Sequence, residues 1–216
     1  MNGKLVTKIL GKIMILEGIL MALPLIVSII YDENIYAFLN PMIVLVGIVY
    51  LTQLLNPKRK GLYQKEGFAI CALVWIIMTL FGALPFVING DIPNYVNALF
   101  ETMSGFTTTG ATILTDIEAL PHGLLFWRSM LQWLGGMGIV VLSLAILPMF
   151  GAGMQLFAAE VPGITYDKLQ PKITDTARKL WELYLLLTII CAILLYVSGM
   201  NIFDAICHSL TTLASG

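Results

Sequence analysis

The chain has 216 residues, of which 58% are hydrophobic and 12% are charged, and its mean hydropathy is +0.89. Soluble domains are about 45–50% apolar and about 25% charged, so this composition predicts an integral membrane protein. The net charge of −1 by itself says nothing about nucleic acid, and no nucleic-acid partner is expected of a membrane protein of this kind. Three cysteines without metal-type spacing predict no disulfide framework and no zinc site.

Five apolar runs are long enough to cross a membrane, which takes about 20 mostly apolar residues in a helix. In chain order they cover about residues 9–30, 36–55, 68–88, 124–150 and 177–198. Lysines precede the first run, as in a signal peptide, but the run is long and is followed by acidic residues rather than a cleavage site. We therefore expect it to be retained as a membrane helix.

Two shorter segments, 94–105 and 201–210, are too short to span and are expected to be re-entrant helices. Each leads into a polar stretch, SGFTTTGAT at 104–112 and TTLASG at 211–216. Irregular backbone at membrane depth is tolerated only where it is buried in protein or lines a wet cavity. The polar stretches are therefore predicted to line a water-filled path.

The basic residues predict how the chain is oriented. If the N-terminus is cytoplasmic, eleven of the twelve Lys and Arg residues fall on the cytoplasmic side, and only Arg128 falls outside. Cytoplasmic loops carry an excess of Lys and Arg, so this orientation is favoured over its opposite.

A weak internal repeat relates the two short segments. A shift of 107 residues places 97–100 on 204–207 and 106–109 on 213–216, with the same order of long helix, short helix and polar stretch. Internal repeats are common in transport proteins. Because residue 110 would pair with a residue 217, we expect the sequence to be truncated inside its second polar loop.

The TTTG run has the chemistry of a monovalent-cation site. Thr107, Thr108 and Thr109 offer carbonyl and hydroxyl oxygens, and Gly110 permits backbone angles that align successive carbonyls. No carboxylate lies within 106–115, which argues against a tight divalent-cation site. The alternative is a plain Thr/Gly loop that joins two helices.

Four stretches carry a resemblance to a known family: SGFTTTGAT, LPHGLLFWRSMLQWLGGMGIVVLSLAILP, MQLFAAEVPG and FDAICHSLTTLASG. The chain resembles the TrkH/KtrB superfamily of potassium uptake proteins over essentially its whole length. The extra leading helices are similar to the TrkH/TrkG branch. The resemblance implies an all-α membrane fold of helix–pore-helix–helix repeats with re-entrant filter loops. The implied divisions are a two-helix pair at 1–55, a first repeat at 56–150, a cytoplasmic connection at 151–176 and an incomplete second repeat at 177–216.

The resemblance also implies which residues form the potassium filter. Thr108 and Thr109 in the first loop, and Ser215 and Gly216 in the second, would coordinate K+. The expected supporting residues are Thr107, Gly110, Ala111 and Ala214. Arg128 could pair with Glu101 on the first short helix and brace the filter, or it could be an arginine that extends to the interface.

The implied function is K+ translocation through a filter of backbone carbonyls, as the membrane subunit of a Trk-type uptake system rather than an enzyme. Uncoupled cation conduction and a non-conducting scaffold are the alternatives. The resemblance implies the plasma (inner) membrane, a homodimer, a cytosolic nucleotide-binding TrkA-like regulator and no cofactor, with Na+ or H+ as candidate further ions.

Several residues have both a structural and a functional interpretation. Glu17 is an intramembrane carboxylate, but its position beside Lys12 and toward the cytoplasmic end favours a structural role. The glycines of WLGGMG are expected to allow close helix packing. Four prolines are expected at kinks or helix ends, namely Pro24, Pro41, Pro85 and Pro148.

Overall fold

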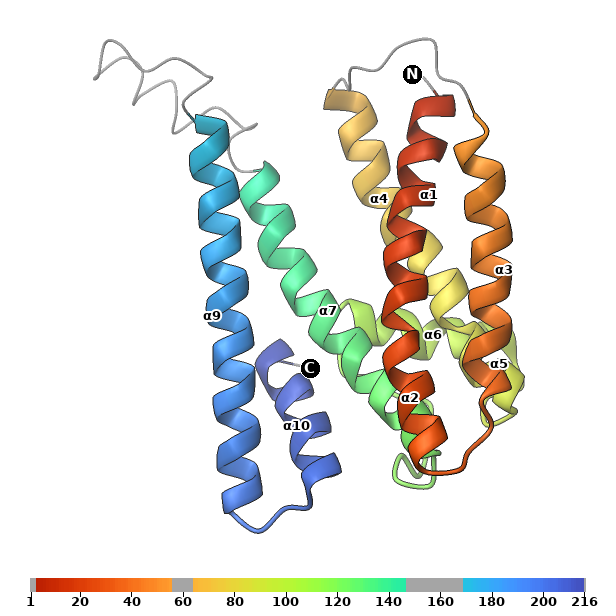
Figure 1. The fold of residues 1–216 in the computed structure, drawn as a ribbon, viewed down its shortest axis with the longest axis vertical. Coiled ribbons are helices and arrows are strands. Elements are labelled where there is room, and N and C mark those ends of the chain that lie inside the picture. Colours follow the sequence, from red (N-terminus) through yellow and green to blue (C-terminus); the bar gives the residue numbers. More distant parts are fainter. Residues whose placement is uncertain (1–2, 56–63, 147–168, 216) are drawn as a thin grey trace. The chain divides into compact units, whose positions relative to one another are not determined.

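The computed structural model describes residues 3–55, 64–146 and 169–215, and every regular element in these residues is a helix (Figure 1). The chain forms two compact units, Met1–Leu131 and Gln132–Gly216. The order of helices predicted from the apolar runs is confirmed: the long runs are helical, with the first and third interrupted at Met21 and Ala83, and each short segment forms a separate short helix.

In its described residues, the first unit contains six helices and the beginning of a seventh. Helix α1 packs against α3 and α4, α3 packs against α5, and α4 packs against α6 (Figure 1). The helices are α1 (Gly3–Leu20), α2 (Ala22–Ile30), α3 (Tyr36–Gln53), α4 (Gln64–Gly82), α5 (Leu84–Asn89), α6 (Tyr95–Phe106) and α7 (His122–Ile146). Helix α6 is the first of the two predicted re-entrant helices.

The second unit contains the rest of α7, then α9 (Leu169–Val197) and α10 (Ile202–Ala214), the last two packed together (Figure 1). Helix α9 begins at Leu169, so the end of the predicted connection at 151–176 is helical. Pro171 falls in its first turn, where a missing backbone N–H is tolerated. Residues 151–168 of that connection lie outside the described residues.

Four stretches of the described helices are long and apolar enough to cross a membrane: Gly3–Ile30, Tyr36–Gln53, Glu66–Asn89 and Arg178–Val197. They correspond to the first, second, third and fifth predicted spans. The fourth predicted span corresponds to α7, and its last residues, 147–150, lie outside the described part of the chain.

Proline marks two breaks within these stretches. Pro24 and Pro85 lie in the first turns of α2 and α5, directly after the interruptions at Met21 and Ala83. Pro41 lies inside α3 without ending it, and Pro148 lies outside the described residues. The prediction of kinks or helix ends is therefore confirmed at Pro24 and Pro85, whereas α3 accommodates its proline.

The start of α7 is fixed by a residue from the loop between α2 and α3. The Glu33 carboxylate accepts hydrogen bonds from the backbone N–H groups of His122 (2.7 Å) and Gly123 (2.9 Å). It also lies 2.9 Å from Nδ1 of the His122 ring, which stacks on Tyr31. A carboxylate at a helix N-terminus satisfies free N–H groups and complements the helix dipole. The leading helices thereby hold the helix that follows the first polar loop.

Candidate ion-path site

Helix α6 carries the first polar loop, and its two ends are defined by specific hydrogen bonds. At its start, the Asn94 side chain accepts hydrogen bonds from the N–H groups of Val96 (2.9 Å) and Asn97 (3.3 Å). This is a standard N-cap, which satisfies donors that the first helical turn leaves free. The short helix therefore begins at a sequence-encoded signal just after the turn at 89–93.

The end of α6 is a Schellman motif built on threonine. The Thr108 N–H donates to the Gly105 carbonyl (2.9 Å), and the Thr109 N–H donates to the Ser104 carbonyl (3.0 Å). Thr108 has a φ of 53°, in the left-handed region that glycine usually occupies at this position. The motif stops the helix and turns the backbone into the TTTG run.

The oxygen atoms of the run divide into two classes. The Thr107 hydroxyl donates to the Met103 carbonyl (2.8 Å) and lies 2.7 Å from the Thr109 hydroxyl. In contrast, no group in the described part of the chain donates a hydrogen bond to the carbonyl oxygens of residues 107–110. Thr107, Thr109 and Gly110 are exposed, and Gly110 has a φ of 72°. The loop thus presents unpaired carbonyls, as a site for a dehydrated cation requires.

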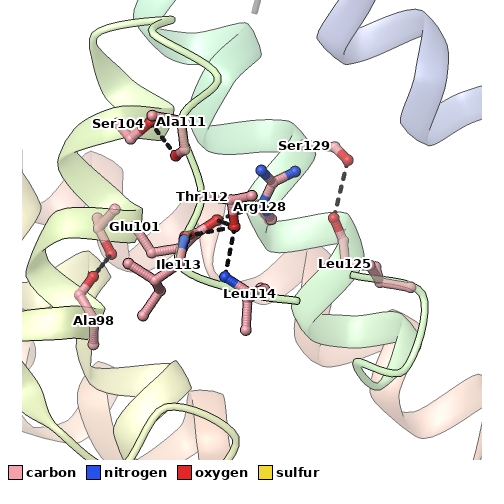
Figure 2. A network of polar contacts seen from close by, with 11 residues as sticks. Ala98, Glu101, Ser104, Ala111, Thr112, Ile113, Leu114, Leu125, Arg128 and Ser129 are labelled. Atoms are coloured by element: carbon pink, nitrogen blue, oxygen red, sulfur yellow. Dashed lines mark hydrogen bonds and ion pairs between the residues drawn. The ribbon is translucent and has the colours of Figure 1, made fainter. Parts of the chain in front are cut away.

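The returning half of the loop is tied to α6 by Glu101 (Figure 2). Thr112 donates its hydroxyl to both Glu101 carboxylate oxygens (3.0 and 2.9 Å), and the Ile113 N–H donates to Oε2 (3.1 Å). Arg128 on α7 donates from Nε to Oε1 at 2.6 Å. The predicted Glu101–Arg128 ion pair is present, and its role as a filter brace stays a prediction.

Both members of this ion pair are largely buried. The Glu101 side chain is 1% exposed and the Arg128 side chain is 13% exposed. A buried carboxylate needs partners for its charge and for its lone pairs, and here Arg128, Thr112 and the Ile113 N–H supply them. These contacts fix the positions of α6, the returning half of the loop and the start of α7 relative to one another.

A second tie lies closer to the TTTG run. Ser104 donates its hydroxyl to the Ala111 carbonyl at 2.5 Å (Figure 2). Ala111, predicted to support the filter, therefore has its carbonyl engaged by the helix. Ser104 and Thr112 lie at the two ends of the SGFTTTGAT stretch, but no role was predicted for either, because their hydrogen bonds depend on how the irregular loop folds back on α6.

The second polar loop repeats this geometry at the offset of 107 residues. Asn201 caps α10, as Asn94 caps α6, and its side chain accepts from the Asp204 N–H (2.8 Å). Ser215 ends α10 with a φ of 60°, as Thr108 ends α6 with a φ of 53°. Ala214 is buried, and Gly216 lies outside the described residues. The weak sequence repeat thus has a matching cap and a matching left-handed turn.

A family model described as "TrkH: Cation transport protein" matches residues 32–216. The Trk system potassium uptake protein TrkH of Escherichia coli K12 is 46% identical over 222 residues, which cover all of this chain and 46% of that protein. The TrkG protein of the same organism is 36% identical, over 99% of this chain and 45% of its own length. The chain thus spans about half the length of these curated relatives.

A solved structure gives the same result at the level of the fold. The crystal structure of the potassium transporter TrkH from Vibrio parahaemolyticus matches with a TM-score of 0.80 and 36% identity, over 97% of this chain and 42% of that one. The helix–pore-helix–helix fold expected from the sequence is therefore confirmed. With a family match over most of its length, the chain belongs to the TrkH family of cation transport proteins.

Proposed function

We propose that this chain carries part of the K+ path of a Trk-type uptake system. Dehydrated K+ would bind the backbone carbonyls of Thr108 and Thr109 and, in the second loop, those of Ser215 and Gly216. Thr107, Gly110, Ala111 and Ala214 would set the backbone geometry around them. The membrane potential would drive entry, at about 2.3 kcal/mol per elementary charge and 100 mV.

The observation that carries this proposal is the set of unpaired carbonyls at the C-terminal end of α6. That end of a helix bears partial negative charge, which favours a cation. Because the carbonyls lack internal donors and the loop is exposed, an incoming ion would replace water rather than break hydrogen bonds within the protein.

A wider setting for the same site is part of the proposal. We propose a plasma (inner) membrane protein with a cytoplasmic N-terminus, which works as a homodimer with a cytosolic nucleotide-binding, TrkA-like regulator. Na+ or H+ could accompany K+. The division into a leading pair (1–55), a first repeat (56–150), a connection (151–176) and a second repeat (177–216) belongs to the same proposal.

Potassium uptake tests the proposal directly. The gene that encodes this chain is expressed in a bacterial strain without its own K+ uptake systems, and growth on limiting K+ and Rb+ uptake are measured. We expect rescue by the wild type and loss with Thr108→Pro or Thr109→Asp. Proline forbids the positive φ at residue 108, and aspartate adds a charge at the mouth of the path.

Thr115→Val is the matched control, because Thr115 is exposed farther along the same loop. All variants are compared at equal membrane expression. Rescue that survives the changes at 108 and 109 would remove these residues from the path. A well-expressed wild type that rescues nothing would favour the non-conducting scaffold. Uptake that persists without a membrane potential or an ion gradient would contradict electrically driven entry.

A further inference from the structure

Glu17 is a fully buried acidic residue at the middle of the first membrane-length stretch. Its exposure is 0%, and neither carboxylate oxygen has a hydrogen-bond partner among the described residues. The stretch Gly3–Ile30 places 14 residues before Glu17 and 13 after it. The expectation from the sequence that Glu17 lies toward the cytoplasmic end of its span stays a prediction.

The carboxyl lies where α1 meets the end of α4 and the first pore helix, α6. A Cβ atom added at Gly82 would lie 3.5 Å from Oε1 of Glu17, 3.1 Å from Cγ2 of Thr102 and 3.6 Å from the Phe106 ring. Thr102 and Phe106 are buried residues of α6, and Phe106 directly precedes the TTTG run. Glu17 therefore lies close to the buried face of α6, the helix that carries the TTTG run.

The polar groups around this position are already engaged. The Thr102 hydroxyl donates to the Ala98 carbonyl (2.8 Å), and the Gly82 carbonyl accepts from the buried Trp127 indole (2.9 Å). The Thr102 hydroxyl and the Trp127 indole therefore have their hydrogens engaged elsewhere, and neither donates to the carboxylate of Glu17. The site offers the Glu17 head group no donor in the described residues.

The charged groups on the surrounding helices do not compensate Glu17 either. On α6, Glu101 is bound by Arg128 of α7. On α1, Lys8 donates to the Leu55 carbonyl and Lys12 is exposed. Most of the other described titratable groups have other partners or lie at the surface: Lys4 of α1, Glu66 of α4, Tyr95 of α6, His122 of α7, and Tyr36 and Tyr50 of α3. Cys71 of α4 is a half-buried free thiol and carries no positive charge. Among the described residues, no ion pair includes Glu17.

We propose that Glu17 is a proton-binding site behind the first pore helix. Burying an unpaired carboxylate costs far more free energy than burying the neutral acid, so the packed arrangement holds the carboxyl with its proton. When the proton leaves to water, the remaining charge must gain water or a cation. This requires α1 to separate from Gly82 and Thr102, and so moves the support of the TTTG run.

Infrared difference spectroscopy on the complete protein in lipid nanodiscs tests the proton site without any transport. At neutral pH, wild type minus Glu17→Gln should contain a protonated-carboxyl C=O band that shifts in D2O. Glu182→Gln is the control, because Glu182 is exposed and paired with Arg178. Wild type minus Glu182→Gln should contain the bands of an ionised carboxylate instead. If Glu17→Gln does not fold, Glu17→Met serves as the reference. If wild type minus Glu17→Gln contains ionised-carboxylate bands instead of the protonated-carboxyl band, the proposal is overturned.

The link to the pore helix is tested by the pH dependence of Rb+ uptake, and this half rests on the proposed function. Wild-type uptake should fall severalfold from acidic to alkaline pH, whereas Glu17→Gln, which mimics the neutral acid, should lose most of that dependence and keep uptake at alkaline pH. Identical pH profiles would overturn the link. Absence of wild-type uptake at every pH would instead count against the transport function, and the infrared result would stand by itself.

Discussion

At the scale of single residues, the Glu101–Arg128 pair has the largest expected energetic effect. Removing one member leaves the other buried without its counter-charge, which typically costs about 3–5 kcal/mol. We expect Arg128→Gln to lower the free energy of unfolding by that amount, and Glu101→Gln to cost less because Thr112 and Ile113 can still donate to the amide oxygen. Thermal unfolding in detergent measures both effects.

The double variant turns these two single variants into a double-mutant cycle, which measures the coupling between Glu101 and Arg128. Glu101→Gln with Arg128→Gln should be more stable than the sum of the single losses predicts, because no uncompensated charge remains. Additive losses would show that the pair contributes no coupling. Arg178→Gln is the control, because Arg178 is 80% exposed and its pair with Glu182 lies on one helix face, where it should contribute little.

Thr108 stores backbone strain at the start of the loop. Its φ of 53° lies in the left-handed region, which costs a non-glycine residue about 1–2 kcal/mol. Thr108→Gly should therefore raise the free energy of unfolding by about 1 kcal/mol. Thr115→Gly, at a residue without positive φ, should lower it by about 0.4–1 kcal/mol through the more flexible unfolded chain. Equal shifts in the melting temperature would contradict the assignment of strain.

At the scale of helices, Gly136 sets how closely α7, α9 and α10 pack within the second unit. A Cβ atom at residue 136 would lie 2.9 Å from the Tyr184 hydroxyl and 3.1 Å from Cα of Ala214, the residue before Ser215. The neighbouring Trp133 carbonyl accepts from Tyr184 (3.2 Å), and its indole donates to Thr188 (3.0 Å). The close packing expected from WLGGMG is confirmed at this glycine.

We expect Gly136→Ala to displace the end of α10 and to lower the free energy of unfolding by about 1–3 kcal/mol, as overpacking does. Rb+ uptake should fall with it, because Ser215 moves with Ala214. Gly47→Ala is the matched control: it has no atom within 4 Å of the added Cβ and should gain up to about 1 kcal/mol from helix propensity. Normal uptake by Gly136→Ala would show that α10 tolerates the displacement.

The comparison of sequence and structure also belongs at this scale. Long apolar runs predicted the helices because length and hydropathy alone decide a membrane span. The positive φ was expected at Gly110, and the structure has it at Thr108 as well, since the Schellman hydrogen bonds outweigh the threonine penalty. Contacts such as Glu33 with His122, or Glu17 beside Gly82, join residues far apart in the chain, and no local pattern encodes them.

At the scale of the whole molecule, the distribution of charge predicts the direction in which the chain crosses the membrane. Eleven of the twelve basic residues fall on one side if the N-terminus is cytoplasmic. Single cysteines report this directly once the three native cysteines, which are free, have been replaced. Lys4 and Asp91 are suitable positions, because both are exposed and the model of alternating spans places them on opposite sides.

In intact cells, Asp91→Cys should react with a membrane-impermeant maleimide, whereas Lys4→Cys should react only after permeabilisation. Both should react equally in detergent, which controls for intrinsic accessibility. The reverse pattern would invert the chain and place the TTTG run toward the cytoplasm. The concentrated positive charge would then face the outside, against the usual bias of membrane insertion. Under the proposed function, labelling also decides whether the carbonyls of residues 107–110 face the side from which K+ would enter.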